Sequence, residues 1–292
     1  MRSRAGVFWY SLGLTLLLLL PLIALTAFLI HQRQQQNELR QAAAERGGLQ
    51  IEQGAQDTWC ALLVVQQEEP AFVLVRADGP EQNVTFCALP GKLQVQAPSG
   101  TTTLAACTLS AGPGRAVQLL SQTVATGETA QRPLHYLAAT QSCWQDCAGE
   151  EAVARLDTAS LLSQAERASI GYGEDSVAEA GAAQAPELIA KLQNCLDTPT
   201  EKADARAAVW EAFARQNENF LASMPEAWKS YSARTLTDLM ATDLADMKAT
   251  LQYISSQPGM TTGYRSAETQ PAAGGEVMLS DDGMQTLREL LR

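Results

Sequence analysis

The sequence has 292 residues, of which 46% are hydrophobic, and it carries 21 Lys and Arg against 32 Asp and Glu, a formal net charge of −11 at pH 7. So many hydrophobic residues exclude a wholly disordered chain. The acidic excess argues against a nucleic-acid partner, because it repels polyanions at long range. A phosphate-bearing ligand would therefore need a local basic site.

The N-terminal segment has the pattern of a membrane span. Residues 7–30 contain no charged side chain, and as a helix they would extend about 36 Å, more than a hydrocarbon core of about 30 Å. Arg2 and Arg4 precede the span, so the positive-inside tendency predicts a cytoplasmic segment at residues 1–6 and an extracytoplasmic remainder. A cleaved signal peptide, the alternative, would have a shorter apolar core and a small-residue cleavage site. The sequence therefore predicts a single-pass protein of the cell membrane.

The rest of the chain is predicted to be a stalk followed by one domain. Residues 31–54 are rich in Gln and charged side chains and have no apolar stripe, which predicts a stalk or linker. Residues 55–292 are expected to form the extracytoplasmic domain. It begins with three short apolar runs, at residues 59–65, 71–75 and 84–89. Rich in Val, Phe and Leu and bounded by Gly and Pro, these runs are typical of strands buried on both faces.

Helical spacing follows the strands, where Val117, Leu120 and Val124 recur on one helix face. Strands followed by helices predict a sheet with helices packed over it. A later helix start is marked by Thr198 as N-cap and Glu201 as its capping-box partner. In chain order after residue 124, we predict a strand at 133–139, a helix at 141–148, a strand at 151–156, a helix at 158–168, a loop at 169–183, helices at 199–222, 225–228, 236–240 and 244–254, a strand at 260–264, a loop at 266–275, an edge strand at 277–279 and a closing helix capped by Ser280.

The six cysteines are Cys60, Cys87, Cys107, Cys143, Cys147 and Cys195. An even number outside the membrane permits disulfides, but Cys60 and Cys87 lie in apolar strand patterns, where a thiol behaves as a small hydrophobe. We therefore expect mostly free thiols in the core. Cys143 and Cys147 are spaced to share a helix face, but with only two histidines in the chain a zinc site has too few evident ligands.

The order of these elements resembles a known family. The matching stretches are residues 60–65, 71–78, 84–90 and 103–120, and the similarity in hydrophobic pattern extends over residues 58–292. On these stretches the sequence resembles the LytR-CpsA-Psr family, membrane-anchored extracytoplasmic enzymes that move glycopolymers from a polyprenyl pyrophosphate carrier onto the cell wall. The resemblance implies an α/β fold in which a central mixed sheet has helices on both faces. Here one N-terminal transmembrane helix would precede it.

The resemblance lies in the pattern of hydrophobic residues and does not extend to the charged residues of the family's catalytic motifs. Transfer from a pyrophosphate needs a carboxylate for a metal, usually magnesium, and several arginines that bind phosphate oxygens. The matched positions are Glu68, Pro70 and Ala71 for the family's Arg-x-Asp-Thr strand entry, Pro90, Gly91 and Lys92 for its Pro-Arg-Asp turn, and Gly181 and Gln184, within residues 177–186, for two arginines of a later loop. Each matched catalytic position lacks the functional group. We therefore assign no catalytic, cofactor-binding or metal-binding residue and expect no cofactor.

Nearby charged residues are the alternative source of the lost groups. The cations are Lys92, Arg76 and Arg115, and the carboxylates are Glu68, Glu69 and Asp78. Each is more simply a solvated residue beside a strand or turn. Losing one preorganised donor typically costs roughly 3 to 4 kcal/mol of transition-state stabilisation, so the loss of several should leave no useful phosphotransfer.

These observations favour a non-catalytic relative, a pseudoenzyme of the bacterial cell envelope. Its expected partners are the membrane and a polyprenyl-linked glycan, a cell-wall polymer or another protein. The alternative is an active glycopolymer phosphotransferase with displaced catalytic residues, which would use magnesium. A third hypothesis is that the similarity is architectural only, because fold does not fix function.

Overall fold

The computed structural model describes residues 54–98, 100–125, 134–173, 176–216 and 220–292. All of them belong to one unit, Gln53–Arg292. The predicted cytoplasmic segment, the span at residues 7–30 and the stalk up to residue 53 lie outside the described residues, so the membrane anchor stays a prediction. Within the described part, no helix is long and apolar enough to cross a membrane.

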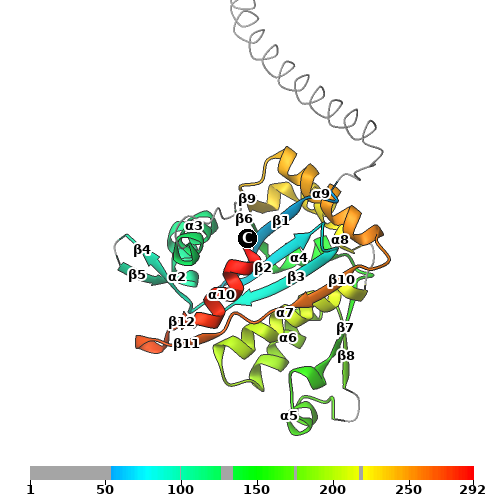
Figure 1. Ribbon diagram of the computed structural model, residues 1–292. Coiled ribbons are helices and arrows are strands. Elements are labelled where there is room, and N and C mark those ends of the chain that lie inside the picture. The colour runs from blue at the N-terminus through cyan, green and yellow to red at the C-terminus, as the bar shows by residue number, and fades with distance from the viewer. Residues whose placement is uncertain (1–53, 99, 126–133, 174–175, 217–219) are drawn as a thin grey trace, which may run out of the picture. The chain divides into compact units, whose positions relative to one another are not determined.

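The centre of the domain is a six-stranded mixed sheet (Figure 1). Strands β1 (Thr58–Gln66), β2 (Ala71–Asp78) and β3 (Asn83–Leu89) follow one another in the chain and pair antiparallel. Strand β1 also pairs in parallel with β6 (His135–Thr140). One edge strand is parallel to its neighbour and the other is antiparallel. Across the sheet the order is β10 (Thr261–Tyr264), β3 (Asn83–Leu89), β2 (Ala71–Asp78), β1 (Thr58–Gln66), β6 (His135–Thr140) and β9 (Thr235–Thr237).

The central strands are buried on both faces, as their apolar runs predict. In β1, Ala61 and Leu63 belong to one core cluster, whereas Leu62 and Val64 belong to the cluster on the opposite face. This alternation is the period-2 pattern of a strand. Because both odd and even positions of these strands are apolar, the sequence correctly predicts that helices cover both faces of the sheet.

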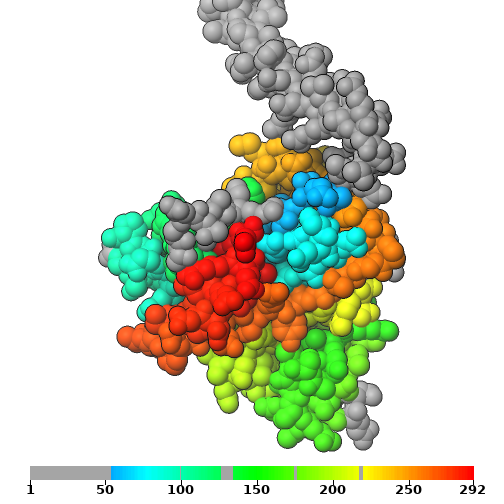
Figure 2. Space-filling model, viewed as in Figure 1, coloured from blue at the N-terminus to red at the C-terminus, as the bar shows by residue number. Residues whose placement is uncertain are grey.

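Two layers of helices enclose the sheet, which confirms the predicted α-β-α arrangement (Figure 1). The helices of the first layer are α4 (Gln141–Ala148), α6 (Ala185–Asn194), α7 (Pro199–Gln216), α8 (Phe220–Ser230) and α9 (Ala241–Ser256). Those of the second layer are α2 (Leu104–Ala111), α3 (Pro113–Val124) and α10 (Asp281–Leu290). Figure 2 shows the C-terminal segment at the surface, beside the first strands of the sheet.

Smaller elements complete the domain. A short helix, α5 (Gln164–Ser169), and single 3₁₀ turns join the larger elements. The described residues also form three two-stranded antiparallel sheets, which are β4 (Gln94–Ala97) with β5 (Gly100–Thr103), β7 (Val153–Asp157) with β8 (Val177–Gly181), and β11 (Thr269–Pro271) with β12 (Val277–Leu279). The β4–β5 pair was not predicted from the sequence, and β11 lies in the segment predicted as a loop, residues 266–275.

The predicted helix starts at Thr198 and Ser280 are confirmed. Glu201 Oε2 accepts the Thr198 N–H at 2.9 Å, and Thr198 Oγ1 accepts the Glu201 N–H at 3.2 Å, which completes a capping box. Ser280 Oγ accepts the Gly283 N–H at 3.0 Å. Both caps satisfy backbone N–H groups that have no partner within the helix.

The predicted loop at residues 169–183 is wrong, because it contains strand β8. Ala178 and Ala180 point into the core while their neighbours face outward, so the alternation is that of a strand built from small residues. Alanine has low strand propensity. Antiparallel pairing with β7 overrides that preference. The helix predicted at residues 158–168 is divided into a 3₁₀ turn at Thr158–Ser160 and helix α5, because Ser163 is the N-cap of α5.

Three helix boundaries and one element type in the helical half also differ from the prediction. Helix α7 ends at Gln216 and not at residue 222, and α8 begins at Phe220, so Pro225 lies inside α8 and does not open it. The helix predicted at 236–240 is instead the edge strand β9, which pairs with β6. Helix α9 begins at Ala241, because Asp243 accepts the Met240 N–H at 2.8 Å and stabilises an earlier start.

Candidate functional site

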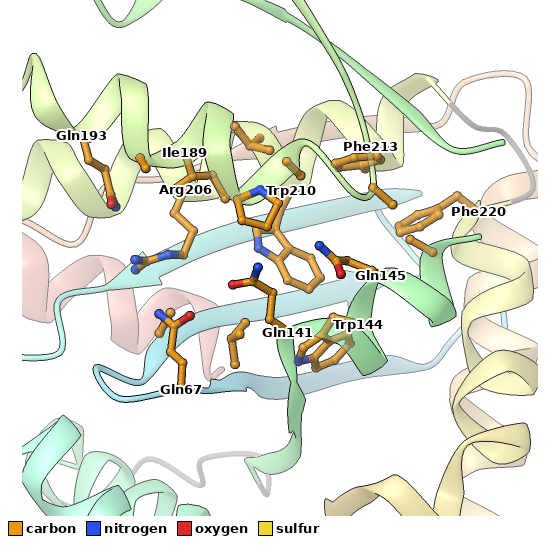
Figure 3. A pocket seen from close by; sticks show the side chains of 18 of the residues that line it. Gln67, Gln141, Trp144, Gln145, Ile189, Gln193, Arg206, Trp210, Phe213 and Phe220 are labelled. Atoms are coloured by element: carbon orange, nitrogen blue, oxygen red, sulfur yellow. The ribbon is translucent and has the colours of Figure 1, made fainter. Parts of the chain in front are cut away.

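A pocket of about 300 Å³ opens between helices α4, α6, α7 and α8 and the turn that joins β1 to β2 (Figure 3). Its volume is at the lower end of the range for small-molecule sites. The side chains that form its walls are mostly apolar, and they include Val65, Trp144, Ile189, Val209, Trp210, Phe213, Phe220 and Met224. The pocket therefore suits a ligand with a hydrocarbon part.

Helix α7 supplies one wall because of its helical spacing. Arg206, Val209, Trp210 and Phe213 stand at positions i, i+3, i+4 and i+7, which share one face of a helix. All four line the pocket. Across from them, the Trp144 ring of α4 lies 5.2 Å from the Trp210 ring, centroid to centroid, in an edge-on contact. The two tryptophans thus fix the spacing between α4 and α7.

A second apolar cavity, of about 50 Å³, lies beside the first. The two share Trp144, Trp210, Phe220 and Met224. From there the smaller cavity reaches the sheet at Leu63. A hydrocarbon chain that enters the pocket therefore meets apolar side chains as far as the core.

Four glutamines provide most of the polar lining: Gln67, Gln141, Gln145 and Gln193. Three of them are held by the backbone, since Gln67 Nε2 donates to Glu69 O at 2.8 Å, Gln145 Nε2 donates to Ala183 O at 3.4 Å and Gln193 Nε2 donates to Lys202 O at 2.6 Å. Each amide keeps a carbonyl oxygen that can accept a hydrogen bond. These oxygens suit ligand hydroxyl or amide groups.

Arg206 is the one charged side chain among the described residues that line the pocket. In Figure 3 it extends from α7 on the same side of the pocket as Gln67 and Gln193. Within the part of the chain that the structure describes, its guanidinium makes no hydrogen bond or ion pair, and no carboxylate lines the pocket. Burial lowers the pKa of Arg206 to about 10. The side chain therefore stays a cation at neutral pH.

An unpaired cation in a largely apolar site should destabilise the free protein. We expect Arg206→Met to raise the free energy of unfolding by about 1 kcal/mol, because a partly desolvated charge is removed while most of the aliphatic packing is kept. Urea denaturation measures the change. Arg155→Met, at an exposed ion pair with Glu179, is the control and should shift stability by less than about 0.5 kcal/mol. A loss of stability in Arg206→Met would contradict this account.

The fold matches solved structures at low sequence identity. TagT of Bacillus subtilis has a TM-score of 0.56 and 14% identity over 81% of this chain and 90% of that chain. TagT bound to LIIa-WTA has a TM-score of 0.56 and 13% identity over 82% of this chain and 91% of that chain. A protein from Enterococcus faecalis described as a transcriptional regulator has a TM-score of 0.57 and 12% identity over 82% of this chain and 89% of that chain. The chain has the LytR-CpsA-Psr fold. No protein-family model and no curated protein matches the sequence.

Two of the segments aligned with LytR-CpsA-Psr motifs border the pocket, but they bring no charge to it. Ala71, at the strand entry, lines the pocket, whereas Glu68 and Pro70 do not. The segment aligned with the arginine-rich loop contributes Ala182, Ala185 and Pro186. Gly181 and Gln184 do not line it, and they lie against each other, since a Cβ on Gly181 would come 2.7 Å from Gln184 Oε1.

The third segment, Pro90 to Lys92, lies outside the pocket lining. A Cβ on Gly91 would lie 3.3 Å from Pro70 O, so the fold brings this turn beside the β1–β2 turn. Lys92 is exposed and its carbonyl accepts the Val277 N–H at 3.1 Å. Among the matched positions of the three segments, Ala71 alone lines the pocket.

The charged residues considered as substitutes also lie outside the pocket lining. Glu68 and Glu69 are exposed, and Arg115 donates to Gln118 on α3. The expectation that Arg76 and Asp78 are solvated is wrong, because Asp78 is only 5% exposed and is paired with Arg76. Magnesium, which the LytR-CpsA-Psr fold implies, does not fit this pocket, since no described carboxylate lines it. The described residues also contain no group of three or more potential metal ligands.

The described cysteines lie in or near the core. Cys87, Cys107, Cys143 and Cys147 are buried thiols outside disulfides. Cys60 is also buried, and its Sγ lies 3.7 Å from Leu290 O. Burial raises the pKa of Cys147 to about 12, with the neighbouring Cys143 as a further cause. These thiols therefore act as small apolar groups, as the sequence predicts.

None of the residues that line the pocket was predicted from the sequence as a binding residue. The signal for Arg206 was present, because a cation stands at position i of a helix face that continues with Val209, Trp210 and Phe213. A charge in line with an apolar stripe is a candidate binding residue, since it would otherwise be buried unpaired. No comparable signal marks the glutamines, which come from three separate segments of the chain.

Proposed function

We propose that this protein is a non-catalytic, membrane-anchored protein of the cell envelope whose extracytoplasmic domain binds a lipid-linked glycan. The observation that carries the proposal is the aromatic-lined pocket, which is bordered by Ala71, Ala182 and Pro186 at or beside the positions aligned with phosphotransferase groups. Hydrocarbon burial contributes about 25 cal/mol per Å². A chain in this pocket would therefore be held without covalent chemistry or a metal.

The polar lining and one similar structure support a glycan-bearing head group. The glutamine oxygens around the pocket match the hydroxyl groups of a sugar. TagT, which shares the fold, has been solved bound to LIIa-WTA, a wall teichoic acid precursor. The predicted span at residues 7–30 would place the domain where such carriers are displayed.

Arg206 is the feature that favours the alternative, an active phosphotransferase. One guanidinium can bind a phosphate oxygen. Phosphoryl-group transfer depends on several positioned charges, including a metal held by a carboxylate. Because the described pocket lining offers a single cation and no carboxylate, Arg206 supports binding more than transfer.

A binding experiment tests the proposal. The full chain in phospholipid nanodiscs is titrated with an undecaprenyl pyrophosphate analogue, with magnesium and with EDTA, and binding is followed by tryptophan fluorescence from Trp144 and Trp210. We expect saturable binding that magnesium does not change. Ala190→Trp, which places a bulky ring in the pocket lining, should weaken binding at least about tenfold, since the apolar contact area is lost.

The control is Asn194→Trp, an exposed position of the same helix that does not line the pocket. It should bind as the unmodified chain does. Absence of binding, or equal binding by both variants, would overturn the proposal. Binding that requires magnesium, or transfer of the glycan to a wall acceptor, would establish the phosphotransferase alternative.

A further inference from the structure

We propose that Asp204 is a proton-sensitive latch, which holds residues 265–268 against helix α7 when its carboxyl group is neutral and loosens them when it is ionised. These residues join β10, at the edge of the central sheet, to the β11–β12 pair and α10 (Figure 1). Ala267, within them, is buried in the core cluster of the second helical layer, whereas α7 belongs to the first layer. The latch therefore acts where the two layers are connected, and it does not depend on which ligand the pocket binds.

Helix α7 faces this connection with a row of polar side chains. Thr200, Asp204 and Glu211 stand at positions i, i+4 and i+11, and at about 100° per residue they lie within about 40° of one another around the helix. Thr200 Oγ1 accepts the Thr269 N–H at 3.2 Å. Glu211 Oε1 accepts a hydrogen bond from Thr262 Oγ1 on β10. The two ends of the row thus hold the chain on either side of residues 265–268.

Asp204 is the least satisfied member of the row. Its carboxyl group has a hydrogen bond with the Ser266 side chain, in the middle of the connection. Its Oδ1 atom is buried and has no hydrogen-bond partner within the described residues. A carboxylate oxygen that is removed from water without a donor destabilises the ionised form far more than the neutral acid. The docked connection therefore favours a protonated Asp204.

The charged side chains around Asp204 act in the same direction. Glu201, one turn earlier on α7, and Glu268, in the connection, both raise its pKa. Hydrogen bonds at the start of α7 lower the pKa of Glu201, so this neighbour is negatively charged near neutral pH. The connection also carries a cation, Arg265, but it forms an ion pair with Glu289 at 2.7 Å. An ionised Asp204 therefore meets like charges.

The strands beside Asp204 contribute two further titratable groups, Cys87 on β3 and Tyr264 on β10. Burial raises the pKa of both, and the charge of Asp204 is the next cause. Neither group therefore ionises near neutral pH. Burial also raises the pKa of Asp204 to about 6, although the Ser266 hydrogen bond acts to lower it. Asp204 thus changes its charge near pH 6.

The direction of the pH effect follows from this raised pKa. When the connection loosens, the carboxyl group returns to water and to an ordinary pKa of about 3.9, so the docked state binds the proton more tightly. Docking is therefore strongest below about pH 4, weakens as the pH rises to about 6, and changes little above that. A difference of about two pKa units corresponds to about 100-fold in the docking equilibrium. Because Asp204 is only half-buried, solvent screening reduces the effect, and we expect about tenfold.

Hydrogen exchange of the full chain in nanodiscs tests the latch. Mass spectrometry follows the amides of residues 262–269 between pH 4.5 and pH 7.5, and each rate is divided by the intrinsic exchange rate at that pH. We expect these amides to be protected about tenfold less at pH 7.5 than at pH 4.5. The amides of α3, on the other face of the sheet, are the internal reference and should show no such change. Asp204→Asn, which keeps the shape without the charge, should keep the high protection at both pH values.

The matched control is Asp197→Asn, which removes an exposed carboxyl group just before α7. It should keep the full pH response of the unmodified chain. A flat pH profile in the unmodified chain would overturn the proposal by itself, whether or not Asp204→Asn folds. A pH response that persists in Asp204→Asn, or one that Asp197→Asn also removes, would contradict the assignment of the latch to Asp204.

Discussion

Replacing Arg76 by methionine is expected to lower the free energy of unfolding by about 3 kcal/mol and to loosen the C-terminal helix α10. Arg76 Nε donates to Asp78 Oδ2 at 3.1 Å, and its Nη2 binds the same oxygen. Asp78 is buried. Removing one partner of a buried ion pair leaves an uncompensated charge, and losses of about 3 to 5 kcal/mol are typical.

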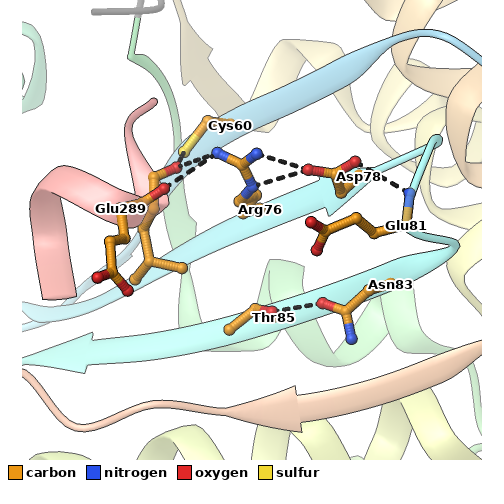
Figure 4. Close-up of polar contacts among 8 residues, drawn as sticks. Cys60, Arg76, Asp78, Glu81, Asn83, Thr85 and Glu289 are labelled. Atoms are coloured by element: carbon orange, nitrogen blue, oxygen red, sulfur yellow. Dashed lines mark hydrogen bonds and ion pairs between the residues drawn. The ribbon is translucent and has the colours of Figure 1, made fainter.

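The same guanidinium holds the end of the chain. Arg76 Nη1 donates to Leu290 O at 3.0 Å and to Glu289 O at 3.2 Å, both in the last turn of α10 (Figure 4). Carbonyls in the last turn of a helix have no partner within the helix, and a cation there is favourable. The α10 amides should therefore exchange hydrogen faster in Arg76→Met, which mass spectrometry can measure.

Arg265→Met is the matched control, because Arg265 binds the Glu289 carboxylate at 2.7 Å in an exposed pair. Exposed pairs contribute about 0 to 1 kcal/mol. If both variants lose the same small amount in urea denaturation, the buried Arg76–Asp78 pair does not stabilise the fold. A large loss confined to Arg76→Met would show that a residue once considered as a catalytic substitute is structural.

The central sheet was predictable from the sequence because its signal is local. The apolar runs at residues 59–65, 71–75 and 84–89 have apolar side chains at both odd and even positions, which predicts strands buried on both faces. A helix start such as the one at Thr198 is recognised from four consecutive residues of the sequence. Strand β8 carries no such signal. Its alanines and glycine form a strand only because β7 lies beside them, a contact between residues distant in sequence.

The pocket was not predictable in the same way. Apolar periodicity on α7 shows that Trp210 and Phe213 face inward, but it does not show whether they meet side chains or a space. The residues that line the pocket include small ones, among them Ala182 and Ala185, beside the large aromatic ones. Such complementarity across segments is a property of packing. Arg206 alone could have been found from sequence, as a charge that interrupts an apolar stripe.

Replacing Trp144 by alanine is expected to cost about 4 kcal/mol of unfolding free energy, within the range of about 3 to 5 kcal/mol for large aromatic residues in a core. The side chain is 6% exposed and its ring lies 4.9 Å from that of Trp228. Its Nε1 donates to Val64 O at 3.2 Å, which ties α4 to β1. Urea denaturation measures the loss. Trp144→Phe keeps the ring contacts without the N–H and should cost about 1 to 2 kcal/mol, the value of one hydrogen bond with a reduced ring.

The pocket and its smaller neighbour share Trp144, so its removal should also join the two spaces. An apolar cavity of that kind stays dry and binds small aromatic molecules. Indole should therefore stabilise Trp144→Ala by an amount that rises with its concentration, and it should stabilise Trp144→Phe much less. If indole stabilises both variants equally, the helices have closed over the missing ring. The apolar space would then depend on this one side chain, and hydrocarbon binding should fail in Trp144→Ala. If rescue is selective, α4 and α7 keep their spacing through Trp210 and Trp228, and the pocket is a fixed feature of the fold that a ligand can enter without rearranging the core.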